Sequence, residues 1–331
     1  NFVVLNAITN KIIFEDIFLE AFIKTMSKVL MIDIEGTNIR AAVANIGSSN
    51  LINPIKNNHN QVVSIDAFVN KFLEQDPLIR HIVFSVAGPK INNSISMTNA
   101  ELRIDKNYFQ EHFKLDSCHI LNDWESIGHS LSIVRNNEIK IINNGKLFND
   151  TALVIGPGTG LGAALVIKDD IILSTELGNS LISIPKIQEL TQKNNNYFNN
   201  VESIISGKGL SKIFSLISGS NKNPEEIVST YESNKFSKES IDIFLASFSQ
   251  LLSELALIYM PGKGIFLSGG LIRSLYRFLD LDTFMKNFLE NKESPQKEIL
   301  KQTHLALITK EMASLHGCLY FINKFNKKIG T

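Results

Sequence analysis

The sequence predicts a mixed α/β protein of two domains. Apolar, strand-like runs come in pairs followed by helix-like stretches, and this arrangement occurs twice along the chain, as expected for two α/β units. The chain has 331 residues, of which 44% are hydrophobic and 20% charged. Such a length and composition are typical of a globular protein in which each domain has its own core.

The expected strands are short apolar runs bounded by polar or glycine-containing turns. They lie at 28–34, 39–46, 81–87, 118–121, 152–155, 163–167, 171–174 and 264–268. Helical periodicity of the apolar residues predicts helices at about 65–74, 105–113, 124–134, 203–218 and 238–259. Two Asn-rich segments, 53–60 and 191–200, are expected to be surface loops.

Residues 1–26 form an N-terminal extension ahead of the first expected strand. Apolar residues recur in it at helical spacing: Ile13, Phe14, Ile17, Phe18, Ala21 and Phe22. Acidic residues interrupt the run and no small-residue cleavage site follows, so it is not a secretory signal. Two alternatives stay open. The extension is a helix that packs on the body of the protein or on a partner, or it precedes the true start at Met26.

The composition excludes several classes of protein. Lys plus Arg equals Asp plus Glu, at 33 each, so no basic field favours nucleic acid or an anionic membrane. No apolar run in the sequence reaches transmembrane length. The two cysteines, Cys118 and Cys318, lack metal-ligand spacing and indicate neither a zinc site nor a disulfide framework. We therefore expect a cytoplasmic protein.

The stretch "LMIDIEGTNIRAAVAN" (30–45) reads as two antiparallel strands around a short turn. Turns of small residues with exposed backbone N–H groups are suited to holding a phosphate. Glu35, however, places a carboxylate in this turn, where glycine would be the easy choice.

A second stretch, "LVIGPGTGLGAALVI" (153–167), is a strand, a glycine-rich loop and another apolar run. Gly158, Gly160 and Ala163 satisfy the dinucleotide pattern GxGxxA, but that pattern must open a helix. Here the glycines lead into a β-branched run, so we expect a phosphate-binding hairpin; the alternative is a purely structural one. A third stretch, "GIFLSGGLIRSL" (264–275), is a strand that passes through two glycines into a helix, where a flat group could approach the backbone.

The stretch "ILNDWESIGHSL" (120–131) is a short strand that ends in Asn122 and Asp123 before a helix. A carboxylate at the C-terminal end of a strand is well placed for catalysis. The alternative is that Asp123 is an ordinary helix N-cap.

Together these segments resemble the hexokinase/actin/Hsp70 superfamily and, more closely, the bacterial ATP-dependent glucokinases, over about residues 27–325. The matching segments are "DIEGTNIR", "FSVAGP", "SMTN", "LNDWESIG", "IGPGTGLG", "ELGN", "VESIISGKGL" and "FLSGGL", in the family's order. The zinc-binding Cys/His cluster of the related repressor/open-reading-frame/kinase branch is absent from the sequence. The resemblance implies two RNase H-like α/β domains that flank a central cleft. The small domain would be 27–134 plus 308–331, with a C-terminal helix from about 308, and the large domain 135–307.

The resemblance also implies a role for individual residues. Asp123 would take the proton from the sugar 6-hydroxyl. The sugar would be bound by Thr98, Asn99, Asn122, Glu176, Asn179 and Glu202. ATP and its phosphates would lie at Asp33, Gly36, Thr37, Asn38, Gly156, Gly158, Thr159, Gly160, Gly269 and Gly270. Mg²⁺ would accompany ATP and contact Asp33 through water, and a homodimer is a family expectation.

The sequence departs from the family in two motifs. The usual Asp-x-Gly-Gly-Thr-Asn has Glu35 in place of its first glycine, and the usual Glu-Gly-Gly-His becomes Glu176-Leu177-Gly178-Asn179, which loses the imidazole. We expect ATP-dependent phosphorylation of glucose at its 6-hydroxyl, the first step of glucose use in glycolysis. The alternative, favoured by these two departures, is a catalytically weak or inactive sugar-binding regulatory protein.

Overall fold

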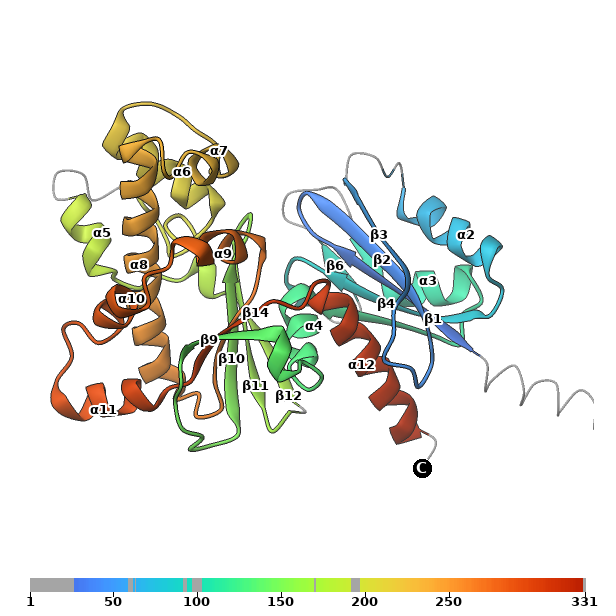
Figure 1. Cartoon of the computed structure of the whole chain (residues 1–331). Helices are drawn as coiled ribbons and strands as arrows, with labels where there is room; N and C mark the ends of the chain where they lie inside the picture. The colour runs from blue at the N-terminus through green and yellow to red at the C-terminus, as the bar shows by residue number, and fades with distance from the viewer. Residues whose placement is uncertain are drawn as a thin grey trace, which may run out of the picture. The chain divides into compact units, whose positions relative to one another are not determined.

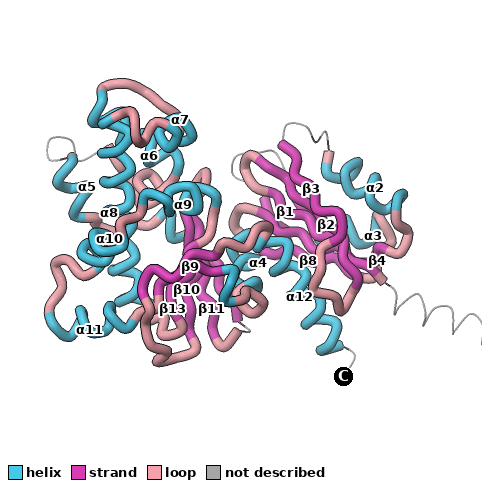
Figure 2. Tube along the Cα trace, viewed as in Figure 1, coloured by secondary structure: helices cyan, strands magenta, loops and turns pink. Residues whose placement is uncertain are grey.

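The structure, a computed structural model, describes residues 27–58, 62, 64–91, 94–96, 103–169, 171–191 and 197–329. These residues form a mixed α/β protein (Figures 1 and 2). The chain divides into two compact units: unit 1 holds the described residues up to Ser126 and those from Met312 onward, and unit 2 is Ile127–Glu311. The N-terminal extension, with both alternatives for it, lies outside the described residues.

Unit 1 is built on a five-stranded sheet in the order β3-β2-β1-β4-β8. Its strands are β1 (Lys28–Ile34), β2 (Asn38–Asn45), β3 (Ile52–Asn58), β4 (Ile79–Val86) and β8 (Ser117–Asn122). β1, β4 and β8 are parallel, so their C-terminal ends meet at one edge of the sheet. β1 and β2 form an antiparallel hairpin. A small sheet of β5 (Lys90–Ile91), β6 (Ser94–Ser96) and β7 (Arg103–Asp105) completes the unit.

Helices cover both faces of the main sheet of unit 1 (Figure 1). Leu30 and Ile32 face the side of α2 (Ile65–Gln75) and α3 (Lys106–His112). Val29 and Met31 face α12 (Ala313–Ile329) instead. Because side chains alternate along a strand, Asp33 follows Val29 and Met31 and also lies on the α12 face.

Unit 2 is built on a six-stranded sheet in the order β12-β11-β10-β13-β14-β9. Its strands are β9 (Ile139–Asn143), β10 (Thr151–Pro157), β11 (Leu161–Ile167), β12 (Ile171–Thr175), β13 (Gly264–Leu267) and β14 (Leu305–Ile308). Its helices are α5 (Pro185–Leu190), α6 (Gly207–Ser218), α7 (Pro224–Ser229), α8 (Lys235–Tyr259), α9 (Gly270–Leu275), α10 (Leu281–Phe288) and α11 (Ser294–Gln302). Helix α4 (Asp123–Ser130) contains the boundary between the units.

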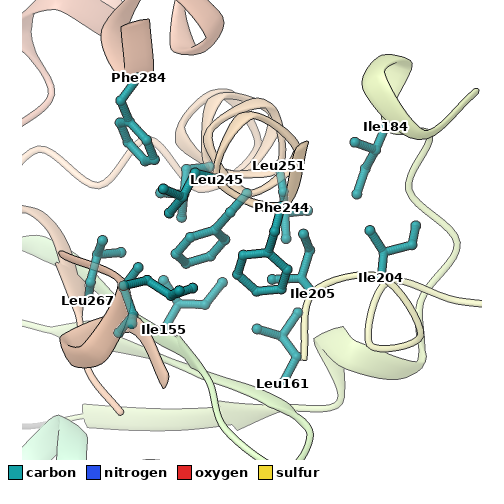
Figure 3. Close-up of a cluster of buried hydrophobic side chains, with 14 of the residues drawn as sticks. Ile155, Leu161, Ile184, Ile204, Ile205, Phe244, Leu245, Leu251, Leu267 and Phe284 are labelled. Atoms are coloured by element: carbon teal, nitrogen blue, oxygen red, sulfur yellow. The ribbon is translucent and has the colours of Figure 1, made fainter. Parts of the chain in front are cut away.

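The core of unit 2 surrounds α8, and Phe244 lies within it (Figure 3). Phe244 and Phe248 are both fully buried. The expectation that no apolar run reaches transmembrane length was wrong for α8, which is long and apolar enough to cross a membrane. However, 72% of its most apolar stretch is buried inside the protein. That burial is typical of the central helix of a globular core.

Several sequence-based expectations were wrong. Residues 53–58, expected as a loop, belong to β3. β3 lies at the edge of its sheet, where a proline is tolerated and polar side chains face solvent. The helix expected from 203 begins at Gly207, because Ser206 caps it by accepting a hydrogen bond from Gly209 N at 3.0 Å. The C-terminal helix begins at Ala313, after β14.

We predict that unit 1 loses stability as the pH falls below 6.5, because of His119. This side chain is 8% exposed, lies edge-on to Phe321 and Phe325, and its Nε2 has no hydrogen-bond partner among the described residues. Burial, and then the charge of Lys106, lower its pKa to about 4. In the unfolded chain His119 binds a proton as the pH falls through about 6.5, whereas in the folded chain it stays neutral down to about pH 4. This difference costs about 2 kcal/mol of folding stability at pH 5.

Denaturant unfolding, followed by the fluorescence of Trp124, would measure this difference between pH 7.5 and pH 5. His119→Phe should reduce the loss, whereas His112→Gln, a change of an exposed histidine, should not. An equal loss in wild type and His119→Phe would contradict the assignment.

Candidate functional site

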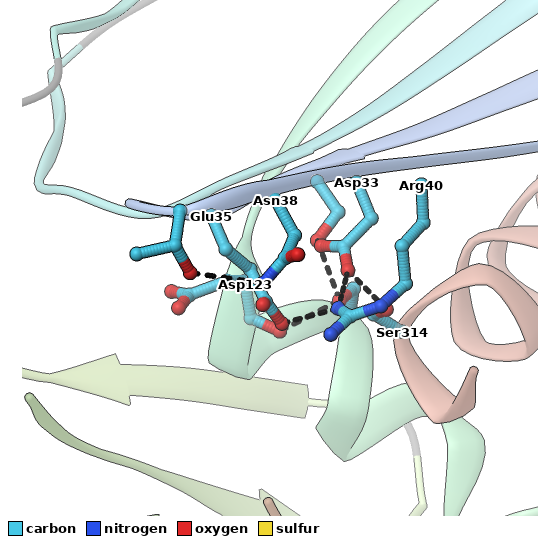
Figure 4. Close-up of polar contacts among 9 residues, drawn as sticks. Asp33, Glu35, Asn38, Arg40, Asp123 and Ser314 are labelled. Atoms are coloured by element: carbon cyan, nitrogen blue, oxygen red, sulfur yellow. Dashed lines mark hydrogen bonds and ion pairs between the residues drawn. The ribbon is translucent and has the colours of Figure 1, made fainter. Parts of the chain in front are cut away.

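In unit 1, the candidate site is organised by Asp33 at the C-terminal end of β1 (Figure 4). The Asp33 side chain is only 1% exposed. Its Oδ1 accepts a hydrogen bond from Ser85 Oγ at 2.7 Å, and its Oδ2 accepts from Ser314 Oγ at 2.7 Å and Arg40 Nη1 at 2.9 Å. Charge-assisted hydrogen bonds of this kind offset the penalty for burying a carboxylate.

The turn between β1 and β2 is closed by a hydrogen bond from Glu35 N to Asn38 O at 2.9 Å. Gly36 and Thr37 lie exposed between them. Glu35 has no positive φ, so a residue with a side chain fits this position without backbone strain. Its carboxylate pairs with Arg40, and burial followed by the charge of Asp33 raises the pKa of this carboxyl group.

Asn122, not Asp123, caps helix α4. Asn122 Oδ1 accepts hydrogen bonds from Trp124 N at 2.9 Å and Glu125 N at 3.3 Å, and its Nδ2 donates to Gly88 O at 2.9 Å. The alternative of Asp123 as an ordinary N-cap is therefore wrong. Asn122 is held rigidly, and one hydrogen of its amide is left for another acceptor.

Asp123 is the first residue of α4, and its carboxylate does not cap the helix (Figure 4). Burial, and then the charge of Asp33, raise its pKa to about 8. Its carbonyl oxygen accepts a hydrogen bond from Ser126 Oγ at 2.6 Å, and that hydroxyl lies 2.9 Å from Ser85 Oγ. Ser126 thus holds the backbone of Asp123 beside Ser85, which donates to the Asp33 carboxylate. A carboxyl group that titrates near neutral pH is suited to proton transfer.

In unit 2, the glycine-rich stretch is a hairpin, as the sequence predicted, because β10 and β11 are antiparallel. Its loop is Gly158–Gly160, closed by Gly158 N to Gly160 O at 2.7 Å. Gly158 and Thr159 are exposed, whereas Gly156 lies inside β10 opposite Gly162. The start of α6 joins this loop through Gly207 N, which donates to Gly158 O at 2.9 Å.

The two glycines after β13 pack against the same hairpin. Gly269 has φ +120°, and a Cβ there would lie 2.9 Å from Pro157 O. The preceding Ser268 N donates to Ile155 O at 3.0 Å. Gly270 begins α9, and a Cβ on it would meet nothing within 4 Å. Unit 2 therefore brings the candidate phosphate and adenosine segments together.

Three of the candidate sugar-binding residues also lie together in unit 2. Asn179 Nδ2 donates to Glu176 Oε2 at 3.1 Å. Glu202 N donates to Gly178 O at 2.8 Å, and Glu202 Oε2 accepts from Leu161 N at 2.9 Å. Glu202 thus ties the Glu176–Asn179 turn to the glycine-rich hairpin. Thr98 and Asn99 lie outside the described residues.

Three residues of the Asp33 network were not expected from the sequence: Arg40, Ser85 and Ser314. The alternation of strands offered a signal for two of them. Arg40 lies directly opposite Asp33 in the hairpin, and Ser85 lies opposite it in β4. Ser314 gave no such signal, because it comes from a helix 281 residues further along the chain.

Comparison with known proteins gives consistent matches. A sequence profile described as Glucokinase matches residues 30–324. A glucokinase of Chelativorans sp. (strain BNC1) is 26% identical over 314 residues, covering 87% of this chain and 89% of that protein. A glucokinase of Campylobacter jejuni subsp. doylei is 29% identical over 272 residues, covering 76% and 80%.

Solved structures show the same fold. A glucokinase from an Antarctic psychrotroph has a TM-score of 0.76 at 21% identity, covering 90% of this chain and 99% of that one. The glucokinase of Balamuthia mandrillaris, solved in complex with glucose, has a TM-score of 0.72 at 19% identity, covering 89% and 93%.

We predict that Gly178→Ala destabilises unit 2, because the new Cβ would lie 2.7 Å from Leu161 O and 3.1 Å from Glu202 Oε2. Overpacking of this kind typically costs about 1–3 kcal/mol, so a clear fall in Tm is expected. Gly158→Ala is the matched control, since a Cβ there meets nothing within 4 Å. Equal melting temperatures for the two variants would show that Glu202 and the hairpin are not tightly joined.

Proposed function

This chain belongs to the glucokinase family, and on that premise we propose that it transfers the γ-phosphoryl group of ATP to the 6-hydroxyl of glucose. The observation that carries the proposal is the Asp123 carboxyl group at the C-terminal end of β8, with its pKa raised to about 8. The same unit holds Asp33 in a fixed, charge-paired position at the neighbouring phosphate-type turn.

Asp123 would act as the general base. As the sugar 6-oxygen attacks the γ-phosphorus, its proton passes to the Asp123 carboxylate, the new O–P bond forms, and the bond to the bridging oxygen of ADP breaks. Phosphoryl transfer needs little covalent help from the protein and depends on positioning. The hydrogen-bonded serines and the capping amide of Asn122 would supply that positioning.

The residues of unit 1 fit a Mg²⁺ ion held through water rather than by direct ligands. No group of three or more His, Cys, Asp or Glu suited to a metal occurs among the described residues. Both Asp33 oxygens already accept hydrogen bonds, but Oδ1 accepts one only and has a lone pair for a metal-bound water. Mg²⁺ would neutralise phosphate charge when bound with ATP.

Glu176, Asn179 and Glu202 would bind the sugar hydroxyls from unit 2. A site of carboxylates and amides suits a polyol, because it rejects analogues that lack the hydroxyls. The alternative, an inactive sugar-binding protein, is supported by the pairing of Glu35 with Arg40 in the candidate phosphate turn. It is less favoured, since Asn122, Asp123, Glu176 and Glu202 are all present.

A coupled assay of ADP release, with Mg·ATP and a panel of hexoses, tests the proposal. We expect turnover with glucose, and slower turnover with mannose, fructose and N-acetylated hexosamines. A protein that binds glucose without releasing ADP would support the inactive alternative instead.

Asp123→Asn should lower turnover by about 10²–10⁴-fold, the usual contribution of a positioned general base, while the Kd for glucose changes little. In the wild type, kcat/KM should fall as the pH drops below about 8, because the carboxylate that accepts the proton becomes protonated. The variant should lack this dependence. Retention of more than a tenth of wild-type turnover would remove Asp123 from the mechanism.

Asn179→His should lower the KM for glucose more than it changes kcat. Position 179 lies on the proposed sugar-binding turn, where Asn179 is committed to Glu176 and to Asn200 Nδ2 at 3.4 Å. An imidazole would restore the family's residue, and one hydrogen bond is worth about 1 kcal/mol. Initial-rate kinetics would measure the changes in KM and kcat separately. An unchanged or higher KM for glucose would contradict the assigned role.

A further inference from the structure

The Arg40 guanidinium is shared between two carboxylates at the β1–β2 hairpin (Figure 4). The same nitrogen, Nη1, donates to Asp33 Oδ2 and to Glu35 Oε1. A guanidinium nitrogen of this type carries two hydrogens, so both are in use. The guanidinium has three further N–H donors, on Nη2 and Nε.

The two carboxylates are held very differently. Asp33 is 1% exposed and also accepts from Ser85 and Ser314, so it cannot leave without stranding a buried charge. The Glu35 side chain is 38% exposed. Of the two, Glu35 is therefore the carboxylate that can turn toward water without leaving a fully buried charge behind.

Glu35 also changes the charge of the turn. Asp33, Glu35 and Arg40 together carry a net charge of −1, whereas a glycine at 35 would leave a neutral Asp33–Arg40 pair. A polyphosphate at the exposed residues Gly36 and Thr37 would meet this extra negative charge. It would also compete with Glu35 for Arg40, because guanidinium binds phosphate and carboxylate in the same geometry.

We propose that Glu35 is a latch on Arg40: the polyphosphate of the nucleotide replaces the Glu35 carboxylate at Arg40 Nη1, and Glu35 turns to solvent. Glu35 thereby sets the affinity for the nucleotide without taking part in the chemical step. The proposal rests on the proposed function, since it assumes that the hairpin receives a nucleotide.

The test is a double-mutant cycle on the Kd of Mg·ADP, measured by titration calorimetry with no turnover. Glu35→Gln should tighten binding about three- to tenfold, which is about 0.6–1.4 kcal/mol. In an Arg40→Gln background the same change should tighten binding by a clearly smaller factor, because the charge of Glu35 is still removed but no latch is left to release. Asp116→Asn is the matched control. It removes the carboxylate that pairs with Arg80 at the N-terminal ends of β4 and β8, away from the end that carries the candidate site. This change should leave the Kd unchanged.

Glu35→Asp tests the latch without changing Arg40, and it replaces the cycle if the Arg40→Gln protein does not fold. The variant keeps the charge but has a shorter side chain, which weakens the pairing with Arg40. The latch therefore predicts tighter binding of Mg·ADP, whereas simple charge repulsion predicts the wild-type Kd. Equal tightening by Glu35→Gln in both backgrounds would overturn the latch in favour of through-space repulsion. Weaker binding by Glu35→Gln would overturn it in favour of a role in orienting Arg40. If ADP binds to no variant, both the latch and the proposed function fail; normal sugar phosphorylation with no coupling overturns the latch alone.

Discussion

The buried charge of Asp33 is the constraint on which the candidate site of unit 1 depends. A carboxylate that is 1% exposed is costly unless hydrogen-bond donors surround it. Those donors come from three other elements: Arg40 from β2, Ser85 from β4 and Ser314 from α12. The charge therefore fixes the hairpin, the central strands and the C-terminal helix in one arrangement at the edge where the parallel strands end.

In unit 2, the Glu202 carboxylate likewise holds separate segments together. Glu202 accepts from Leu161 N and donates through its own N–H to Gly178 O. A Cβ at Gly160 would clash with the Glu202 carboxylate, and a Cβ at Gly178 would lie 2.7 Å from Leu161 O and 3.1 Å from Glu202 Oε2. A proposed sugar-binding residue thus also contacts the proposed phosphate hairpin, so that recognition of the two proposed substrates would depend on one set of contacts.

The sequence predicted what depends on local pattern. Apolar runs located most strands of both sheets, and the β-branched residues after Gly160 correctly indicated a hairpin. Local pattern failed at β3, a polar edge strand with Pro54. It also failed at the cap of α4, where Asn122 and not Asp123 takes the role. Among site residues, the sequence could not reveal Ser314, because only the packing of α12 on β1 brings it to Asp33.

We propose that this chain moves a phosphoryl group from ATP to a sugar hydroxyl and not to water. Phosphorus NMR of the protein with Mg·ATP and glucose distinguishes the two acceptors. We expect a sugar 6-phosphate signal that grows one for one with ADP, without inorganic phosphate. Inorganic phosphate in place of the sugar ester, or ATP left unchanged with every hexose, would contradict it.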